Sequence, residues 1–456
     1  MEPTTSEPIT TGALPAEETV DRARPSIPPP PDSLEDAGLP EELVAGLVVK
    51  ALHQRGTAVG FELSDALALP FALLDEVLEH LQEHRLVEVR ATKGPRRGEY
   101  VFALTSAGRA RAAEELELSR YVGPAPVPFE DFRRWIELQT IREVRVTQQE
   151  LQRALEGVVL PDSMLQLLGP AINSGRSLFL YGESGNGKSL LAKRLARVFG
   201  DRYYVPHSVL VDGTVMIVYD PILHGFGPSE DAAPSELAST GVMDEILRAV
   251  PEHDPRYVEA RRPVVVTGGE LTLEQLDLQW DATGRMYQAP PQLKAAGGVL
   301  VVDDLGRQRV QVRELLNRWG VPLEHRQDYL TLRSGRKIVV PFDCFVIFST
   351  NLEPRSLADE AFLRRIHYKI EVPGPSREEY ERIFRSCCEE REIEFDPAAL
   401  DFLFDAFYGD AAVPPRRCHP RDVLDHVRDL AEYRGEPPRL SSDLLQPACR
   451  SYFLED

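Results

Sequence analysis

The sequence predicts an α/β fold in which a parallel sheet is sandwiched by helices, with an all-α unit after it and a smaller α+β unit before it. Three observations predict this fold. A glycine-rich segment, GESGNGKS at residues 182–189, lies between an apolar run and a segment of helical spacing. A second apolar run, at residues 299–302, ends in two aspartates. Helical stripes of apolar residues, including Tyr380, Ile383 and Phe384, fill the chain after residue 373.

Residues 182–189, called the glycine loop below, have the composition of a phosphate-binding loop. Gly182, Gly185 and Gly187 can adopt positive φ, so successive backbone N–H groups can turn toward phosphate oxygens at the start of the next helix. Lys188 would reach the β and γ phosphates of a nucleotide, and Ser189 would offer its hydroxyl to Mg²⁺. The alternative, an ordinary glycine-rich turn, is disfavoured by the strand before it and the helix after it. The candidate nucleotide-binding residues are Gly182, Glu183, Ser184, Gly185, Asn186, Gly187, Lys188, Ser189 and Leu190, and Ser189 is also a candidate metal ligand.

The second apolar run has the continuous burial pattern of a central parallel strand. Asp303 follows it directly and would hold the hydration shell of Mg²⁺. Asp304 would polarise the water that attacks the γ phosphate. A purely structural pair of acids at a strand end is the alternative, and the glycine loop upstream favours the catalytic interpretation.

Further motifs follow in the order FVIFSTN (residues 345–351), LADEAFLRRI (357–366) and HPRDVL (419–424). Together with the glycine loop and the two aspartates, they resemble the AAA+ ATPases from about residue 140 to residue 450. The resemblance implies that Asn351 is the sensor 1 residue beside the γ phosphate. It also implies that Arg421 is the sensor 2 residue, because Pro420 occupies the first turn of its helix and Arg421 would point back at the nucleotide.

The same resemblance implies a ring of identical subunits, with a hexamer expected, that binds ATP and Mg²⁺ and hydrolyses ATP. Arg364 or Arg365 would complete the active site of a neighbouring subunit, and Arg365 is preferred because it directly precedes Ile366 and the last strand. A surface salt bridge is the alternative for this pair. One residue departs from the family pattern, which usually has Glu where this chain has Asp304. The shorter carboxylate predicts either slow hydrolysis or a backbone that lies closer to the water.

A hairpin is predicted in DYLTLRSGRKIVVPFD, residues 328–343, because alternating apolar residues flank a turn that contains Ser334 and Gly335. It resembles the pre-sensor 1 β-hairpin of one AAA+ clade, in which the hairpin faces the pore of the ring. Arg333, Arg336 and Lys337 would then contact the substrate, or else form a solvated turn.

The N-terminal part divides into a disordered, Pro-rich tail at residues 1–40 and a winged-helix-like domain at residues 41–121. The helix that would enter a DNA groove is acidic, whereas the wing carries Lys93, Arg96 and Arg97. Protein interaction is therefore favoured over DNA binding. The acids of that helix are Asp75, Glu76, Glu79 and Glu83.

After a linker at residues 122–140, the ATPase core is expected at residues 141–373 and an α-helical lid at residues 374–456. An acidic, Pro- and Gly-rich surface insertion is expected at about residues 221–262. Val158 and Val159 are candidates for contact with an adenine ring or for the core. Met286 and Tyr287 are candidates either for a pore or partner loop or for the core, whereas Trp280 is expected in the core.

Composition limits the function. The formal net charge of −21 disfavours a general nucleic-acid coat and an anionic membrane surface. Five cysteines without C-x-x-C spacing are typical of reduced thiols, and no apolar run is long enough to cross a bilayer, so a cytoplasmic protein is expected. The sequence therefore predicts a ring-forming ATPase that remodels an unknown protein partner. The alternatives are a winged-helix-anchored, DNA-binding AAA+ ATPase for transcription regulation or DNA remodelling, and a slow nucleotide-dependent switch.

Overall fold

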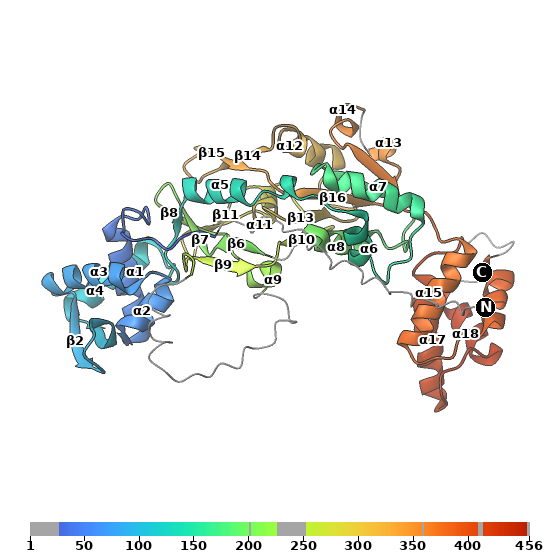
Figure 1. Ribbon diagram of the computed structural model, residues 1–456, viewed down its shortest axis with the longest axis horizontal. Coiled ribbons are helices and arrows are strands. Elements are labelled where there is room, and N and C mark those ends of the chain that lie inside the picture. Colours follow the sequence, from blue (N-terminus) through green and yellow to red (C-terminus); the bar gives the residue numbers. More distant parts are fainter. Residues whose placement is uncertain (1–26, 200–201, 226–251, 358–359, 409–413, 454–456) are drawn as a thin grey trace, which may run out of the picture.

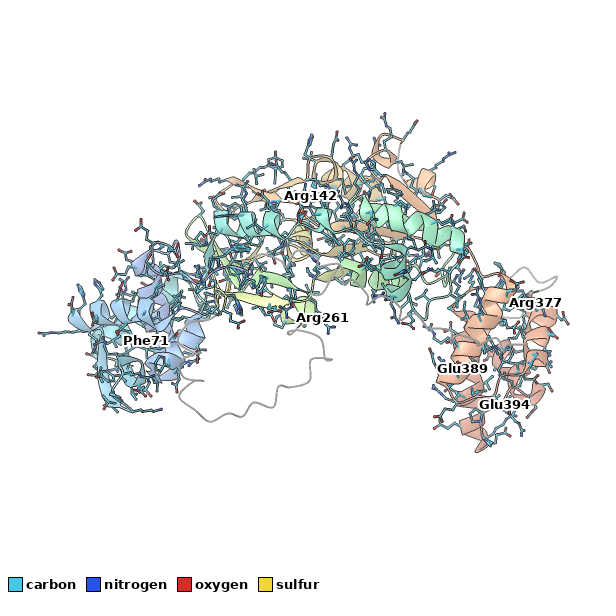
Figure 2. The ribbon with its side chains drawn as sticks, viewed as in Figure 1. Phe71, Arg142, Arg261, Arg377, Glu389 and Glu394 are labelled. Atoms are coloured by element: carbon cyan, nitrogen blue, oxygen red, sulfur yellow. The ribbon has the colours of Figure 1, made fainter. Side chains whose placement is uncertain are left out.

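The computed structural model describes residues 27–199, 202–225, 252–357, 360–408 and 414–453. The elements form an N-terminal unit at one end, several β-sheets with their helices in the middle and a group of helices at the other end (Figure 1). Figure 2 shows Phe71 in the N-terminal unit, Arg142 and Arg261 in the middle, and Arg377 on the C-terminal helices. Within the described ranges, no helix combines the length and the apolar character needed to cross a bilayer.

The N-terminal unit packs helices on a small antiparallel sheet with strand order β1-β3-β2. Leu47, Leu74 and Phe102, from two helices and the central strand, are fully buried in its core. The elements are α1 (Glu41–Arg55), β1 (Thr57–Val59), α2 (Gly60–Leu67), α3 (Phe71–Glu83), β2 (Val87–Thr92), β3 (Tyr100–Leu104) and α4 (Ser106–Leu118).

Residues 27–40 are ordered, so the prediction of a disordered tail over residues 1–40 is wrong for this stretch, and residues 1–26 lie outside the described residues. Ala37 and Leu39 are buried in the N-terminal core. The carbonyl of Pro28 accepts a hydrogen bond from the backbone N–H of Asp254 at 2.7 Å, and the carbonyl of Ala37 accepts one from Arg256 at 2.8 Å. Burial of apolar side chains and hydrogen bonds to the backbone carbonyls offset the conformational entropy that this segment loses on folding. The prolines make that loss smaller, because they already restrict the unfolded chain.

The central sheet is parallel, with strand order β10-β13-β16-β5-β17. Leu178 and Leu180 of β5 pack with helices α6, α7 and α8 on one face, and Phe179 packs with α12 on the other. The predicted α/β fold with a parallel sheet is confirmed. The strands are β5 (Leu178–Tyr181), β10 (Val264–Thr267), β13 (Val299–Val302), β16 (Phe345–Thr350) and β17 (Tyr368–Glu371), and the helices are α6 (Gln148–Ala154), α7 (Asp162–Asn173), α8 (Lys188–Leu195) and α12 (Val312–His325).

A second, mixed sheet with strand order β11-β12-β8-β7-β4 lies between the N-terminal unit and the parallel sheet (Figure 1). The predicted hairpin is present as the antiparallel pair β14 and β15. The remaining strands are β4 (Val127–Pro128), β6 (Tyr203–Pro206), β7 (Ser208–Val211), β8 (Thr214–Ile217), β9 (Tyr257–Ala260), β11 (Gln279–Asp281), β12 (Met286–Gln288), β14 (Gln327–Thr331) and β15 (Lys337–Pro341), and the short helices are α5 (Phe129–Leu138), α9 (Pro221–His224), α11 (Pro291–Lys294), α13 (Pro354–Leu357) and α14 (Glu360–Leu363).

The expected surface insertion at about residues 221–262 lies partly outside the described residues, which omit 226–251. Its C-terminal end is not a surface segment, because Asp254, Arg256 and Tyr257 are buried. Strand β9 pairs there with β6, so this end of the segment belongs to a sheet.

The C-terminal part is helical in its described residues and has its own core. Tyr380, Phe384, Leu403 and Leu424 are fully or almost fully buried in it. The helices are α15 (Arg377–Glu390), α16 (Pro397–Leu403), α17 (His419–Arg434) and α18 (Ser442–Tyr452).

Candidate nucleotide-binding site

The glycine loop connects β5 to α8, and its glycines are required by backbone geometry. Gly182 has φ of 134° and Gly185 has φ of 86°, a region that favours glycine. A Cβ on Gly182 would lie 2.5 Å from the carbonyl oxygen of Val372, and one on Gly185 would lie 2.6 Å from the Sγ of Cys418. The loop therefore approaches both the end of β17 and the start of α17 too closely for any side chain.

Lys188, the first residue of α8, turns its ammonium back into the glycine loop. Its Nζ donates to the carbonyl oxygens of Gly182 at 2.8 Å and Glu183 at 2.9 Å, and to the Oδ1 of Asn351 at 2.7 Å. Burial lowers the pKa of Lys188, and the carboxylates of Asp304 and Asp303 oppose this change. The structure thus brings the predicted Lys188 and Asn351 into direct contact.

Ser189 and the two aspartates meet at the same place. The Ser189 hydroxyl donates to the Oδ2 of Asp303 at 2.6 Å. Asn351 donates from Nδ2 to the Oδ1 of Asp304 at 3.4 Å. Asp304 has φ of 50°, in the left-handed region that aspartate tolerates better than most residues.

The sheet topology explains this convergence. β16 lies between β13 and β5, and all three strands are parallel. Their carboxyl ends therefore share one edge, where the glycine loop, Asp303 and Asn351 follow β5, β13 and β16 in turn. The site combines backbone N–H groups, one buried ammonium and two carboxylates.

The residues present suit Mg²⁺ with a phosphate ligand. Mg²⁺ prefers oxygen ligands and is usually held by one or two carboxylates together with phosphates and water. Ser189 and Asp303 supply a hydroxyl and a carboxylate that already lie 2.6 Å apart. Among the described residues, no group of three or more His, Cys, Asp or Glu forms a separate metal site.

The C-terminal helices contact the glycine loop through residues just before α17. The backbone N–H of Cys418 donates to the carbonyl of Gly185 at 3.0 Å, and Nη2 of Arg416 lies 3.6 Å from the Oε2 of Glu183. Sequence reasoning missed Arg416, although its position five residues before Arg421 in the same basic segment was an available signal.

The predicted sensor 2 residue is engaged elsewhere in this structure. Nε of Arg421 donates to the Oδ1 of Asp422 at 2.9 Å, and the Arg421 side chain is 61% exposed. The side chain therefore points along the surface of α17, and Arg416 is the arginine that the structure places beside the glycine loop.

The two candidate trans-acting arginines differ in their surroundings. Nε of Arg365 donates to the Oε2 of Glu324 on α12 at 3.0 Å, which holds this side chain against its own subunit. Arg364 is exposed. Of the two side chains, Arg364 is therefore the more exposed and Arg365 the one that is paired within the subunit.

The hairpin tip is packed against the second sheet. The backbone N–H of Arg333 donates to the hydroxyl of Tyr287 at 2.9 Å, and its guanidinium lies 5.1 Å from the ring centroid of Trp280. Arg336 pairs with Asp212 at 3.0 Å. Tyr287 is buried, so of the two alternatives for this residue the structure favours core packing over a pore or partner loop.

Comparisons with known proteins give the following similarities. Residues 376–451 match a family model described as a domain of unknown function (DUF8689). No curated protein matches the sequence.

The structure is similar to that of NtrX from Brucella abortus in complex with ADP, with a TM-score of 0.39 and 16% identity over 65% of this chain and 56% of the NtrX chain. It is also similar to RuvB from Thermotoga maritima, described as a Holliday junction branch migration motor, with a TM-score of 0.33 and 14% identity over 69% of this chain and 74% of that chain. This chain thus spans little more than half the length of that NtrX chain.

Proposed function

We propose that this chain is an AAA+ ATPase that binds ATP with Mg²⁺, hydrolyses it, and uses the cycle to remodel a protein partner. One observation carries the proposal: Lys188, Ser189, Asp303, Asp304 and Asn351 come together beside a positive-φ glycine loop at the carboxyl edge of a parallel sheet. Phosphates are bound in such a place by backbone N–H groups and a helix N-terminus.

Each residue then has a separate task. Lys188 exchanges its loop carbonyls for phosphate oxygens, and Ser189 and Asp303 hold Mg²⁺, which when bound would neutralise phosphate charge. Asp304 accepts a proton from the attacking water. Asn351 contacts both Lys188 and Asp304, so it fixes the distance between the phosphate-binding ammonium and the base.

The short carboxylate of Asp304 favours slow hydrolysis. Its side chain is one methylene shorter than that of Glu, and its left-handed backbone brings the Oδ1 within 3.4 Å of Asn351. A nucleotide-dependent switch with little turnover is therefore the second candidate for the same site. Single-turnover phosphate release with excess protein distinguishes the two, since prompt release excludes the switch.

Ring assembly is part of the proposal, with a hexamer as the expected form. Arg364 would supply positive charge to the site of the next subunit, which stabilises charge in the transition state. An exposed arginine two residues before the buried Ile366 is suitably placed for such a contact. Isolated subunits should then hydrolyse ATP poorly.

A protein partner is favoured over DNA by the N-terminal unit, for which we propose a winged-helix role in protein binding. Its basic wing turns back on the acidic helix: Nε of Arg97 donates to the Oδ1 of Asp75 at 2.6 Å, and its Nη2 lies 3.6 Å from Glu79. This pairing neutralises a charge that phosphate binding would use. A separate observation supports a lid role for the C-terminal helices: the residues just before α17, Arg416 and Cys418, contact the glycine loop.

The proposal is tested with the full-length chain by measuring ATP binding and phosphate release in Mg²⁺. Asp304→Asn should bind ATP and release no phosphate. Arg364→Ala should bind ATP, lose oligomer-dependent hydrolysis, and regain it when mixed with Lys188→Ala subunits, which retain Arg364. Wild-type protein with no affinity for ATP or ADP would show that the proposed function is wrong.

A further inference from the structure

Arg417 is an almost fully buried arginine that contacts three separate segments of the chain. Its side chain is 8% exposed and pairs with Glu379, which is 10% exposed, at 2.8 Å. Its Nη1 donates to the carbonyl of Val159 at 2.5 Å, and its Nε donates to the carbonyl of Pro373 at 3.4 Å. One guanidinium therefore joins α15, the segment before α7 and the segment after β17.

One of these segments and both chain neighbours of Arg417 contact the glycine loop of the candidate nucleotide site. The segment before α7, residues 158–160, is half-buried. Pro373 follows Val372, whose carbonyl accepts a hydrogen bond from the Nδ2 of Asn186 in the glycine loop at 3.3 Å. The neighbours of Arg417 in the chain, Arg416 and Cys418, contact the loop themselves. Arg417 thus lies where the C-terminal helices, the glycine loop and residues 158–160 meet.

Only arginine can make this set of contacts. A guanidinium presents its N–H donors in a rigid plane, so one group can reach acceptors in three directions at once. A lysine ammonium is a point charge on a flexible stem and would keep the ion pair with Glu379 without fixing both carbonyls. The positions of Val159 and Pro373 therefore depend on the shape of this side chain as well as on its charge.

We propose that Arg417 is a positioning residue that builds the base side of the nucleotide site. By fixing the carbonyl of Val159, it ties residues 158–160 to Pro373 and to the start of α17, which adjoin the glycine loop, and these residues then form one wall for the nucleoside. This inference rests on the proposed nucleotide binding and extends it, because it separates two parts of the site. The glycine loop and Lys188 bind the phosphates, and the Arg417 network orders the wall that contacts the base.

The test compares a ligand that has a base with one that has none. Binding of Mg²⁺-ADP and of Mg²⁺-pyrophosphate is measured by calorimetry for the wild type, Arg417→Ala and Arg417→Lys. Arg428→Ala is the matched control, since Arg428 lies on the same helix α17 and is 52% exposed. Thermal unfolding is recorded for every variant.

We expect ADP affinity to fall at least about tenfold in Arg417→Ala, the scale of one lost charge-assisted hydrogen bond. Pyrophosphate affinity should stay within about twofold of the wild type. Arg417→Lys should recover thermal stability without recovering ADP affinity, because the lysine keeps the charge and loses the fork. An arginine that only stabilised the fold would not separate ADP affinity from pyrophosphate affinity, since destabilising the fold lowers the affinity for both ligands.

Unchanged ADP affinity in Arg417→Ala, or a parallel loss of ADP and pyrophosphate affinity, would overturn the inference and leave the proposed function standing. Wild-type protein that binds neither ligand would overturn both. If Arg417→Ala fails to fold because Glu379 is left unpaired, Arg417→Met with Glu379→Gln removes the buried charge. That double variant lacks the same two carbonyl contacts, so the same loss of ADP affinity with retained pyrophosphate affinity is expected from it.

Discussion

Replacing Arg416 by alanine, side by side with the same change at Arg421, tests which arginine at the start of α17 contacts the nucleotide that we propose for the glycine loop. Sequence motifs favour Arg421, whereas the structure pairs Arg421 with Asp422 and places Arg416 beside Glu183 of the glycine loop. Among the described residues, Nε of Arg416 is buried without a hydrogen-bond partner, whereas the side chain as a whole is partly exposed, so the end of its guanidinium is open to a ligand.

The expected magnitudes follow from these surroundings. The Arg416 and Glu183 side chains are 33% and 68% exposed and 3.6 Å apart, so their ion pair contributes less than about 1 kcal/mol to folding. A charge-assisted hydrogen bond to a phosphate is worth about 1.5–3 kcal/mol, which corresponds to roughly a 10- to 100-fold change in affinity. Arg416→Ala should therefore weaken nucleotide binding strongly while leaving stability nearly unchanged.

The measurement is equilibrium binding of Mg²⁺-ATP to variants that also carry Asp304→Asn, so that turnover does not distort the isotherm. Thermal unfolding of each variant in the absence of nucleotide reports stability, and Arg428→Ala serves as the neutral control on α17. A larger loss of ATP affinity in Arg421→Ala than in Arg416→Ala would refute the reasoning from the structure. It would return the role to the residue that the motif indicates.

Three other outcomes are expected. Lys188→Ala should lower ATP affinity at least about 100-fold in calorimetry, through lost contacts to two phosphates, whereas Lys193→Ala on the exposed side of α8 should not change it. Arg256→Met leaves the buried Asp254 without its partner, which lies at 2.7 Å, and should reduce the free energy of unfolding in urea by about 3–5 kcal/mol; a loss under about 1 kcal/mol contradicts this. Burial lowers the pKa of His419 from 6.5 to about 4 in the folded state. The unfolded state therefore binds more protons between pH 6.5 and pH 4, and the free energy of unfolding should fall by about 3 kcal/mol over this range. An equal fall in His419→Gln would argue against this origin.

The parts of the site that follow parallel strands could be predicted from the sequence alone. Asp303 and Asn351 each come directly after a continuous apolar run, and such runs become neighbouring central strands whose carboxyl ends meet. The glycine loop is also predictable from local sequence, because its positive-φ positions favour glycine independently of tertiary contacts. Local pattern and sheet topology together bring these residues within hydrogen-bond distance.

The arginines could not be assigned in the same way, because their roles depend on which distant segment they meet. Arg416, Arg417 and Arg421 lie within six residues, and the sequence offers no pattern that separates one that contacts the glycine loop, one that is buried and one that is exposed. The sequence likewise favours Arg365 for contact with a neighbouring subunit, but it does not show that Arg365 pairs with Glu324 of α12 in the fold. Side chains with long stems are positioned by tertiary contacts that periodicity does not encode.

The second sheet escaped prediction because both of its faces are covered. Val215 of β8 packs against the N-terminal core, whereas Met216 packs with the hairpin residues Leu330 and Leu332 on the other side. A strand with one solvent-exposed face alternates between polar and apolar residues, and this alternation is the pattern from which a strand can be predicted. In β8 and β7 both faces are covered and each strand has only four residues, so the alternation disappears. Adjacent residues of β12 also face opposite sides: Met286 packs against the N-terminal core and Tyr287 packs with the hairpin residues. This sheet therefore contacts the N-terminal unit on one face and the hairpin that precedes Asn351 on the other.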